Sequence, residues 1–243
     1  MMRLVELSRS AHAGLRIRPD RVEASAAGQH LIPIVASEFR KAATQYPIVF
    51  VKSPETGRFA PYVLTGLDVE ENLFWSGTEL EVAYVPLNVR RLPFYVGTDA
   101  ASSVLCIDID SPCVDVSGPK GLVNSDGTDS AYLKEILAIL CELIAGKERT
   151  EQFIATALSL DLLAPIMLDI TLADQTPLRL AGLYGLDEER FRQINESKIA
   201  GLWQTGHLDL IYSALLATGQ MFNLIRLKNL RIASSRAWHS NSG

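Results

Sequence analysis

Three aspartates lie close together in the sequence, and their type and spacing suit the binding of a metal ion. Asp108, Asp110 and Asp115 surround Pro112. In a strand, residues two apart share one face, so Asp108 and Asp110 would present two carboxylates side by side. Clustered carboxylate oxygens are ligands that hard cations prefer. The same pattern is typical of a strand end that turns into solvent, and we favour that interpretation.

The cysteines do not add to a metal site. Cys106 and Cys113 flank the aspartates without CxxC spacing, and no histidine stands near them, so we expect no zinc and no other bound metal. With Cys141 they make an odd number, which fits a reducing compartment better than a disulfide framework. The chain carries no HExxH, GxSxG, P-loop or GxGxxG pattern. We therefore assign no catalytic residue and expect no cofactor.

One histidine is a candidate general base. His207 follows Gly206, whereas His12, His30 and His239 are scattered. An imidazole titrates near neutral pH, as a base requires. A polar residue near the start of a helix is the plainer interpretation of His207.

An arginine pair is the strongest candidate for recognition. Arg90 and Arg91 are flanked by two prolines and two aromatic residues: Tyr84, Pro86, Pro93 and Phe94. Guanidinium groups beside aromatic rings on a backbone stiffened by proline can hold a carboxylate or a peptide. Internal pairing of one arginine and solvation of the other is the alternative. We predict a binding site that comprises Arg90, Arg91, Tyr84 and Phe94, with at least one arginine contacting the partner.

The N-terminal half of the chain, which must position these residues, is predicted to be rich in strands. Ser37 can cap a helix over residues 38–44, and Pro47 ends it. Apolar runs then predict strands over 48–51, 62–65 and 72–75, one helical turn over 87–92, and a strand over 104–109.

Later segments are mostly helical. Apolar residues at helical spacing predict helices over 133–145 and 148–160, with Gly146 ending or interrupting the first. A β-hairpin follows over 167–172 and 178–184, then a short helix capped by Asp187 and helices over 198–205 and 208–218. This order favours an α+β fold with a mainly antiparallel N-terminal sheet, a C-terminal helical half and a late β-hairpin. We expect an irregular segment over 1–29, a single composite domain over 30–230 and a flexible tail over 231–243.

Charge and hydropathy restrict the partners. The net charge of the 243 residues is −5, which gives nucleic-acid binding no electrostatic support. Basic residues gather late in the chain and are typical of a solvated helical tail or, alternatively, of a contact with an acidic partner: Arg226, Lys228, Arg231 and Arg236. We find no signal-peptide pattern and no segment apolar enough to span a membrane, so we expect a cytoplasmic protein.

Several short motifs together resemble the SapC family of bacterial proteins. They are spread over most of the chain: His12 to Arg16, Pro33, Glu38-Phe39, Ala42-Ala43, Tyr46 to Phe50, Gly66-Leu67, Glu71 to Phe74, Tyr84 to Pro86, Arg90-Arg91, Pro93-Phe94, Leu105 to Asp108, Leu162 to Pro165, Gly182 to Tyr184, Asp187-Glu188 and Leu210 to Tyr212. Leu80 and Ala214 stand where the family pattern has a tryptophan and a histidine.

The resemblance implies an accessory role rather than a known reaction. SapC-like proteins tend to be encoded beside cupin-like or JmjC-like proteins, tryptophan-halogenase-like proteins and outer-membrane receptors. We therefore expect a non-catalytic accessory or binding protein that acts with a partner protein or peptide. The alternative is an enzyme or metal-dependent protein that uses the Asp108 and Asp110 region or His207.

Overall fold

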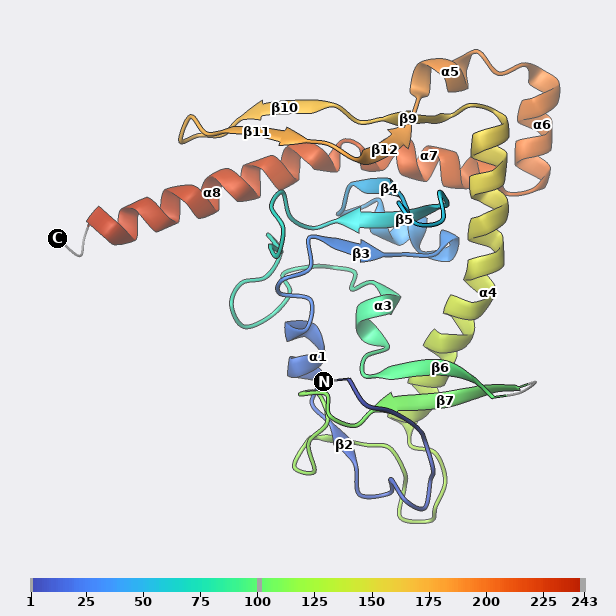
Figure 1. Ribbon diagram of the computed structural model, residues 1–243, viewed down its shortest axis with the longest axis vertical. Helices are drawn as coiled ribbons and strands as arrows, with labels where there is room; N and C mark the ends of the chain where they lie inside the picture. Colours follow the sequence, from blue (N-terminus) through green and yellow to red (C-terminus); the bar gives the residue numbers. More distant parts are fainter. Residues whose placement is uncertain (1, 100–101, 241–243) are drawn as a thin grey trace. The chain divides into compact units, whose positions relative to one another are not determined.

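The computed structural model describes residues 2–99 and 102–240 and confirms the α+β class (Figure 1). The described chain forms two compact units. Unit 1 comprises Met1–Ala27, Trp75–Glu81 and Val85–Ala145, and unit 2 comprises Gly28–Phe74, Val82–Tyr84 and Gly146–Gly243. The boundaries expected from the sequence, 1–29, 30–230 and 231–243, stay a prediction, and residues 241–243 lie outside the described part.

Unit 1 is built on two small antiparallel sheets. Its three-stranded sheet has the order β1 (Leu4–Glu6), β7 (Ser102–Asp108), β6 (Phe94–Asp99), and a second sheet pairs β2 (Arg16–Ile17) with β8 (Lys120–Gly121). Its helices are α1 (Pro19–Ala24), α3 (Leu87–Arg90) and the first part of α4 (Ala131–Ser159). Large apolar side chains of β2, β6, β7 and α4, and of the residue after β8, are fully buried: Ile17, Phe94, Ile107, Leu122, Leu133 and Ile136.

Unit 2 contains a five-stranded antiparallel sheet. The strand order is β3 (Leu31–Pro33), β5 (Phe59–Leu64), β4 (Ile48–Lys52), β12 (Leu183–Leu186), β9 (Leu163–Pro165). The hairpin of β10 (Leu168–Thr171) and β11 (Pro177–Leu180) confirms the late hairpin. The chain that follows it joins the early sheet, because Leu183 pairs with Val51.

The remaining elements of unit 2 are helical. They are the 3-10 helix η1 (Ala36–Glu38), α2 (Phe39–Ala42), α5 (Glu188–Arg192), α6 (Glu196–Gln204), α7 (His207–Ala217) and α8 (Gln220–Ser240). Asp187 caps α5 as expected, since its Oδ1 accepts a hydrogen bond from the Arg190 N–H at 3.0 Å.

Two local predictions are wrong. Residues 72–75 do not form a strand, because the side chain of Asn72 bends the backbone back by accepting a hydrogen bond from the Phe74 N–H at 3.0 Å. Gly146 does not interrupt the long helix, which runs unbroken through α4. A Cβ at Gly146 would lie 2.7 Å from Cγ2 of Val35, so this glycine permits close packing inside unit 2.

The aromatic residues that carry the family resemblance meet in the core of unit 2. Phe39 and Phe50 pack against Phe153, with ring centroids 5.6 Å and 6.2 Å from it. The Tyr46 hydroxyl donates a hydrogen bond of 2.7 Å to the Tyr84 carbonyl. These aromatic residues therefore stabilise the core of unit 2.

The Tyr84 hydroxyl completes this network. It donates to Oε1 of Glu38 at 2.9 Å, and the Val35 N–H donates to Oε2 of the same carboxylate at 2.8 Å. Glu38 is 0% exposed. A buried carboxylate of this kind needs such donors, because water cannot reach it.

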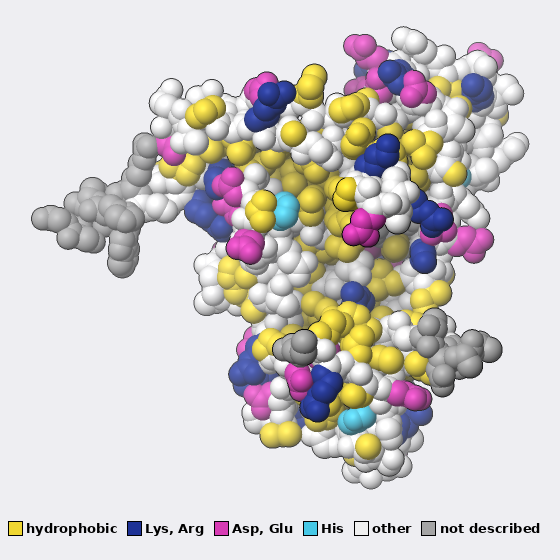
Figure 2. Space-filling model, viewed as in Figure 1, with side chains coloured by type: hydrophobic (Ala, Val, Ile, Leu, Met, Phe, Trp, Pro, Cys, Tyr) yellow, Lys and Arg dark blue, Asp and Glu magenta, His cyan; other side chains and the backbone are white. Residues whose placement is uncertain are grey.

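The C-terminal segment is helical to Ser240, as expected for a helical tail, but it is not solvated throughout. Lys228 has a side chain only 13% exposed and contacts Asp68 and Glu71 at 2.5 Å and 2.7 Å, while Arg231 donates to the Asn72 carbonyl at 3.2 Å. The expectation of solvation is therefore wrong for Lys228, and the side chain of Arg236 is not described. Figure 2 shows hydrophobic side chains gathered along β10, β11 and α8, with charged groups between them.

One helical stretch bears on the expected absence of a membrane span. His207–Ser235 is long and apolar enough to cross a membrane by length and composition alone, and 33% of its most apolar window is buried. Its first part, α7, buries Leu210, Ile211 and Ala214 in unit 2. A core helix meets the same criteria, so the absence of a membrane span stays a prediction.

Candidate functional site

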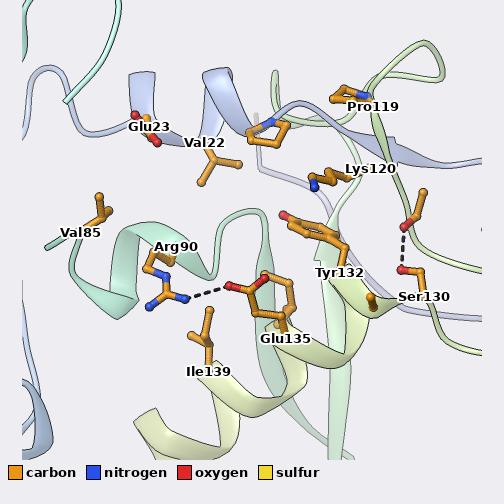
Figure 3. Close-up of a pocket in the computed structure, with 14 residues that line it drawn as sticks. Val22, Glu23, Val85, Arg90, Pro119, Lys120, Ser130, Tyr132, Glu135 and Ile139 are labelled. Carbon is orange, nitrogen blue, oxygen red and sulfur yellow. Dashed lines mark hydrogen bonds and ion pairs between the residues drawn. The ribbon is translucent and has the colours of Figure 1, made fainter. Parts of the chain in front are cut away.

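Unit 1 contains a cavity of about 560 Å³, a volume typical of ligand-binding pockets (Figure 3). Its apolar lining comes mainly from α1, α4 and a residue two positions before α3: Pro19, Val22, Val85, Ile136 and Ile139. Six of the lining side chains are polar: Glu23, Arg90, Lys120, Ser130, Tyr132 and Glu135. Apolar walls with a few polar groups are the usual composition of a binding site.

The start of α4 fixes one wall of the cavity. The Ser130 hydroxyl accepts a hydrogen bond from the Leu133 N–H at 3.1 Å and donates to the Gly121 carbonyl at 2.7 Å. Ser130 thereby caps the helix and ties its first turn to β8. Lys120, on β8, and Tyr132, in the first turn, are held on this wall, where the helix dipole adds partial positive charge.

The opposite side of the cavity is formed by α1 and α3. Pro19 stands in the first turn of α1, where its fixed φ suits helix initiation. The helix buries Val22 and leaves Glu23 half-buried, with the Leu80 N–H 3.5 Å from its carboxylate. Arg90, at the end of α3, forms an ion pair of 2.8 Å with Glu135 of α4.

Arg91 has a different role from Arg90. Its guanidinium lies 4.4 Å from the centroid of the Tyr95 ring, and it donates to the Asn88 side chain and the Phe94 carbonyl, both at 2.9 Å. Burial lowers the pKa of Arg91, although the group stays a cation. Arg91 stabilises the turn into β6 and does not line the cavity.

The structure thus brings only one of the four predicted binding residues to the cavity. Arg90 lines it, whereas Phe94 lies beneath it, fully buried, with its ring centroid 6.4 Å from that of Tyr132. Tyr84 belongs to unit 2 and bonds Glu38.

Two functional candidates, Lys120 and Tyr132, did not emerge from the sequence. Neither side chain makes a hydrogen bond or ion pair to another residue within 2–99 and 102–240. Burial is the main cause that raises the pKa of Tyr132, so its hydroxyl keeps its proton at neutral pH. The signals available were a lysine inside the glycine-rich loop 117–121 and a tyrosine two residues after a helix cap.

The three aspartates of the cluster form hydrogen bonds or ion pairs with neighbouring residues. The backbone N–H of Arg3 donates to Oδ1 of Asp108 at 2.8 Å, and its guanidinium pairs with Asp110 at 2.9 Å. Asp115 accepts hydrogen bonds from Ser117, which lower the pKa of its carboxyl. In the described part of the chain, no three histidine, cysteine or acidic side chains group together as metal ligands.

His207 is buried in unit 2, with 6% of its surface exposed. Its Nδ1 has no hydrogen-bond partner among the described residues, and its ring packs edge-on against Phe153 at 5.8 Å. Burial, aided by the nearby charge of Arg149, lowers the pKa of this imidazole.

We expect His207 to make unit 2 less stable in acid. Below about pH 6.5 the unfolded imidazole binds a proton that the folded one does not. As the pH decreases below that value, the free energy of unfolding falls by up to about 1.4 kcal/mol per pH unit. The fall ends when the pH reaches the lower pKa of His207 in the folded protein. Denaturant unfolding of the wild type and His207→Phe between pH 7 and pH 5 measures the difference. Identical pH dependence in both proteins would contradict this expectation.

Comparison with known proteins adds one result. The family model described as SapC matches residues 7–224. Neither a curated protein nor a solved structure matches the chain.

Proposed function

Because the chain belongs to the SapC family, we propose that it is a cytoplasmic, non-catalytic accessory protein that binds a segment of a partner protein through the cavity of unit 1. The observation that carries the proposal is the composition of that cavity. It combines apolar walls with two donor side chains that have no partner within the described chain, Lys120 and Tyr132. Such a surface gains free energy when apolar groups and acceptors of a ligand cover it.

The polar groups of the cavity support binding rather than reaction. Arg90 and Glu135 neutralise each other at 2.8 Å. The raised pKa of Tyr132 keeps the phenol protonated, so it can donate a hydrogen bond but is a poor base. The family association makes cupin-like or JmjC-like and halogenase-like proteins the first partners to test.

Site-specific photo-crosslinking in cells that express the chain tests the proposal. The photoreactive residue p-benzoylphenylalanine replaces Ala131, an exposed residue of α4 that lines the cavity, or, as a matched control, Lys134, an exposed residue of α4 that does not line it. We expect a protein crosslink from position 131 and none from position 134.

A second variant ties that crosslink to the cavity. Val85→Trp places an indole in the cavity beside Arg90 (Figure 3). We expect it to remove the crosslink from position 131 while circular dichroism and the melting temperature stay near the wild-type values. Equal crosslinking from positions 131 and 134, or a crosslink that survives Val85→Trp, would contradict binding at this cavity.

A further inference from the structure

The cavity of unit 1 has an uneven distribution of polar groups. The Lys120 amine and the Tyr132 hydroxyl both point into it from the wall formed by β8 and the start of α4 (Figure 3). Glu23 lies toward the Val85 side, and Arg90 is neutralised by Glu135. Two donors without partners within the described chain therefore mark one end of the cavity, and the negative charge of Glu23 lies away from them.

We propose that this end of the cavity binds the free C-terminal carboxylate of the partner segment, with Lys120 and Tyr132 as donors and the apolar wall receiving the last side chain. This inference rests on the proposed function and specifies the chemistry of its ligand.

A carboxylate matches the donors in number and charge. Its two oxygens can accept one hydrogen bond from the ammonium group of Lys120 and one from the phenol of Tyr132. Hydrogen bonds that involve a charged group are shorter and stronger than neutral ones. A phosphate dianion is a poorer match, because Glu23 lines the same cavity without an ion-pair partner in the described part of the chain and would repel its second charge.

The apolar wall explains why the carboxylate belongs to a chain end. In a C-terminal residue the carboxylate and the side chain branch from one Cα, so the site must offer donors and apolar surface next to each other. Tyr132 and the buried Ile136 stand one turn apart on α4, and both line the cavity with Ile139 and Val22. The carboxylate of an internal aspartate or glutamate would leave this apolar surface uncovered.

Packing and backbone pairing position both donor residues, but their polar groups form no hydrogen bond within the described chain. The Tyr132 ring packs against the buried Phe94, which fixes the direction of its hydroxyl. The backbone of Lys120 pairs with Ile17 across β2 and β8. Removal of either polar group should therefore weaken binding while leaving the fold intact.

Affinity selection from two degenerate pools of N-acetylated hexapeptides tests the inference on the full chain. The pools have the same composition, but one ends in a free carboxylate and the other in a carboxamide. We expect enrichment of free acids that end in an apolar residue. The amide of a selected peptide should bind at least about tenfold more weakly, as loss of charged hydrogen bonds predicts.

Three variants assign the effect to its residues. Tyr132→Phe and Lys120→Met should each weaken binding of the selected acid about tenfold and leave binding of its amide unchanged. Lys134→Met, which removes an exposed lysine outside the cavity, should change neither. Melting temperatures confirm that each variant folds.

The outcomes separate this inference from the function on which it rests. Equal affinity for acid and amide, or enrichment of amides with internal acidic residues, would overturn C-terminal recognition and leave peptide binding standing. If the wild type enriches peptides from neither pool above the level found with Val85→Trp, peptide binding itself is overturned.

Discussion

Replacement of Glu38 by alanine is expected to lower the free energy of unfolding by about 3 kcal/mol, because it leaves buried donors without an acceptor. The carboxylate is 0% exposed and accepts from the Val35 N–H and the Tyr84 hydroxyl at 2.8 Å and 2.9 Å. Each unsatisfied buried donor costs about 1–3 kcal/mol. Thermal unfolding should show a drop of roughly 6–12 °C for a chain of this size.

The control for Glu38→Ala is Glu151→Ala, which removes an exposed carboxylate from α4 in the same unit. We expect that control to change the free energy of unfolding by less than about 0.5 kcal/mol. A double-mutant cycle with Tyr84→Phe should show coupling, because Tyr84→Phe removes one of the two groups that donate hydrogen bonds to Glu38. Equal melting temperatures for Glu38→Ala and Glu151→Ala would refute a structural role for the carboxylate.

The sequence was sufficient for elements whose signals are local. Pro47 followed by an apolar run located β4, and Asp187 located the start of α5. Strand β6 was missed because its own residues carry little local signal. Its stabilising contacts come from other segments, namely pairing with β7 and packing of the Arg91 guanidinium on Tyr95. A helical C-terminal segment was expected, but the burial of Lys228 was missed because it depends on tertiary contacts with Asp68 and Glu71.

The candidate site was predictable only in part, for a related reason. Arg90 stood out because prolines and aromatic residues surround it in the sequence. Lys120 and Tyr132 have no such neighbours, and the cavity that unites them with Val22 is assembled from segments about 100 residues apart in the chain. Local sequence patterns indicate where proline stiffens the backbone. A cavity, in contrast, depends on which distant segments of the chain the fold brings together.

Gly146 illustrates how one residue type permits two structures. Glycine in a helix is unfavourable by about 1 kcal/mol relative to alanine, which is why the sequence suggested a break. In unit 2 the residue is buried, and its carbonyl accepts a hydrogen bond of 2.6 Å from the Thr150 hydroxyl. That hydroxyl also accepts from the Ala36 N–H at 2.8 Å, so the helix is held against the segment that contains Val35.

Gly146→Ala is therefore expected to lower the free energy of unfolding by about 2 kcal/mol, the size of a typical overpacking penalty. The new methyl group would lie 2.7 Å from Cγ2 and 2.8 Å from Cβ of Val35. Gly201→Ala is the matched control, because no atom lies within 4 Å of a Cβ placed there in α6. Without a clash, alanine should raise the free energy of unfolding by about 0.5–1 kcal/mol through its helix propensity.

Denaturant unfolding of both glycine variants measures these opposite signs. Val35→Ala should relieve the clash, so the double variant Val35→Ala/Gly146→Ala should lose less stability than the sum of the single changes. If Gly146→Ala stabilises the protein as Gly201→Ala does, the helix and the Val35 segment do not pack at this distance. If the two changes add without coupling, the loss arises from something other than the contact with Val35.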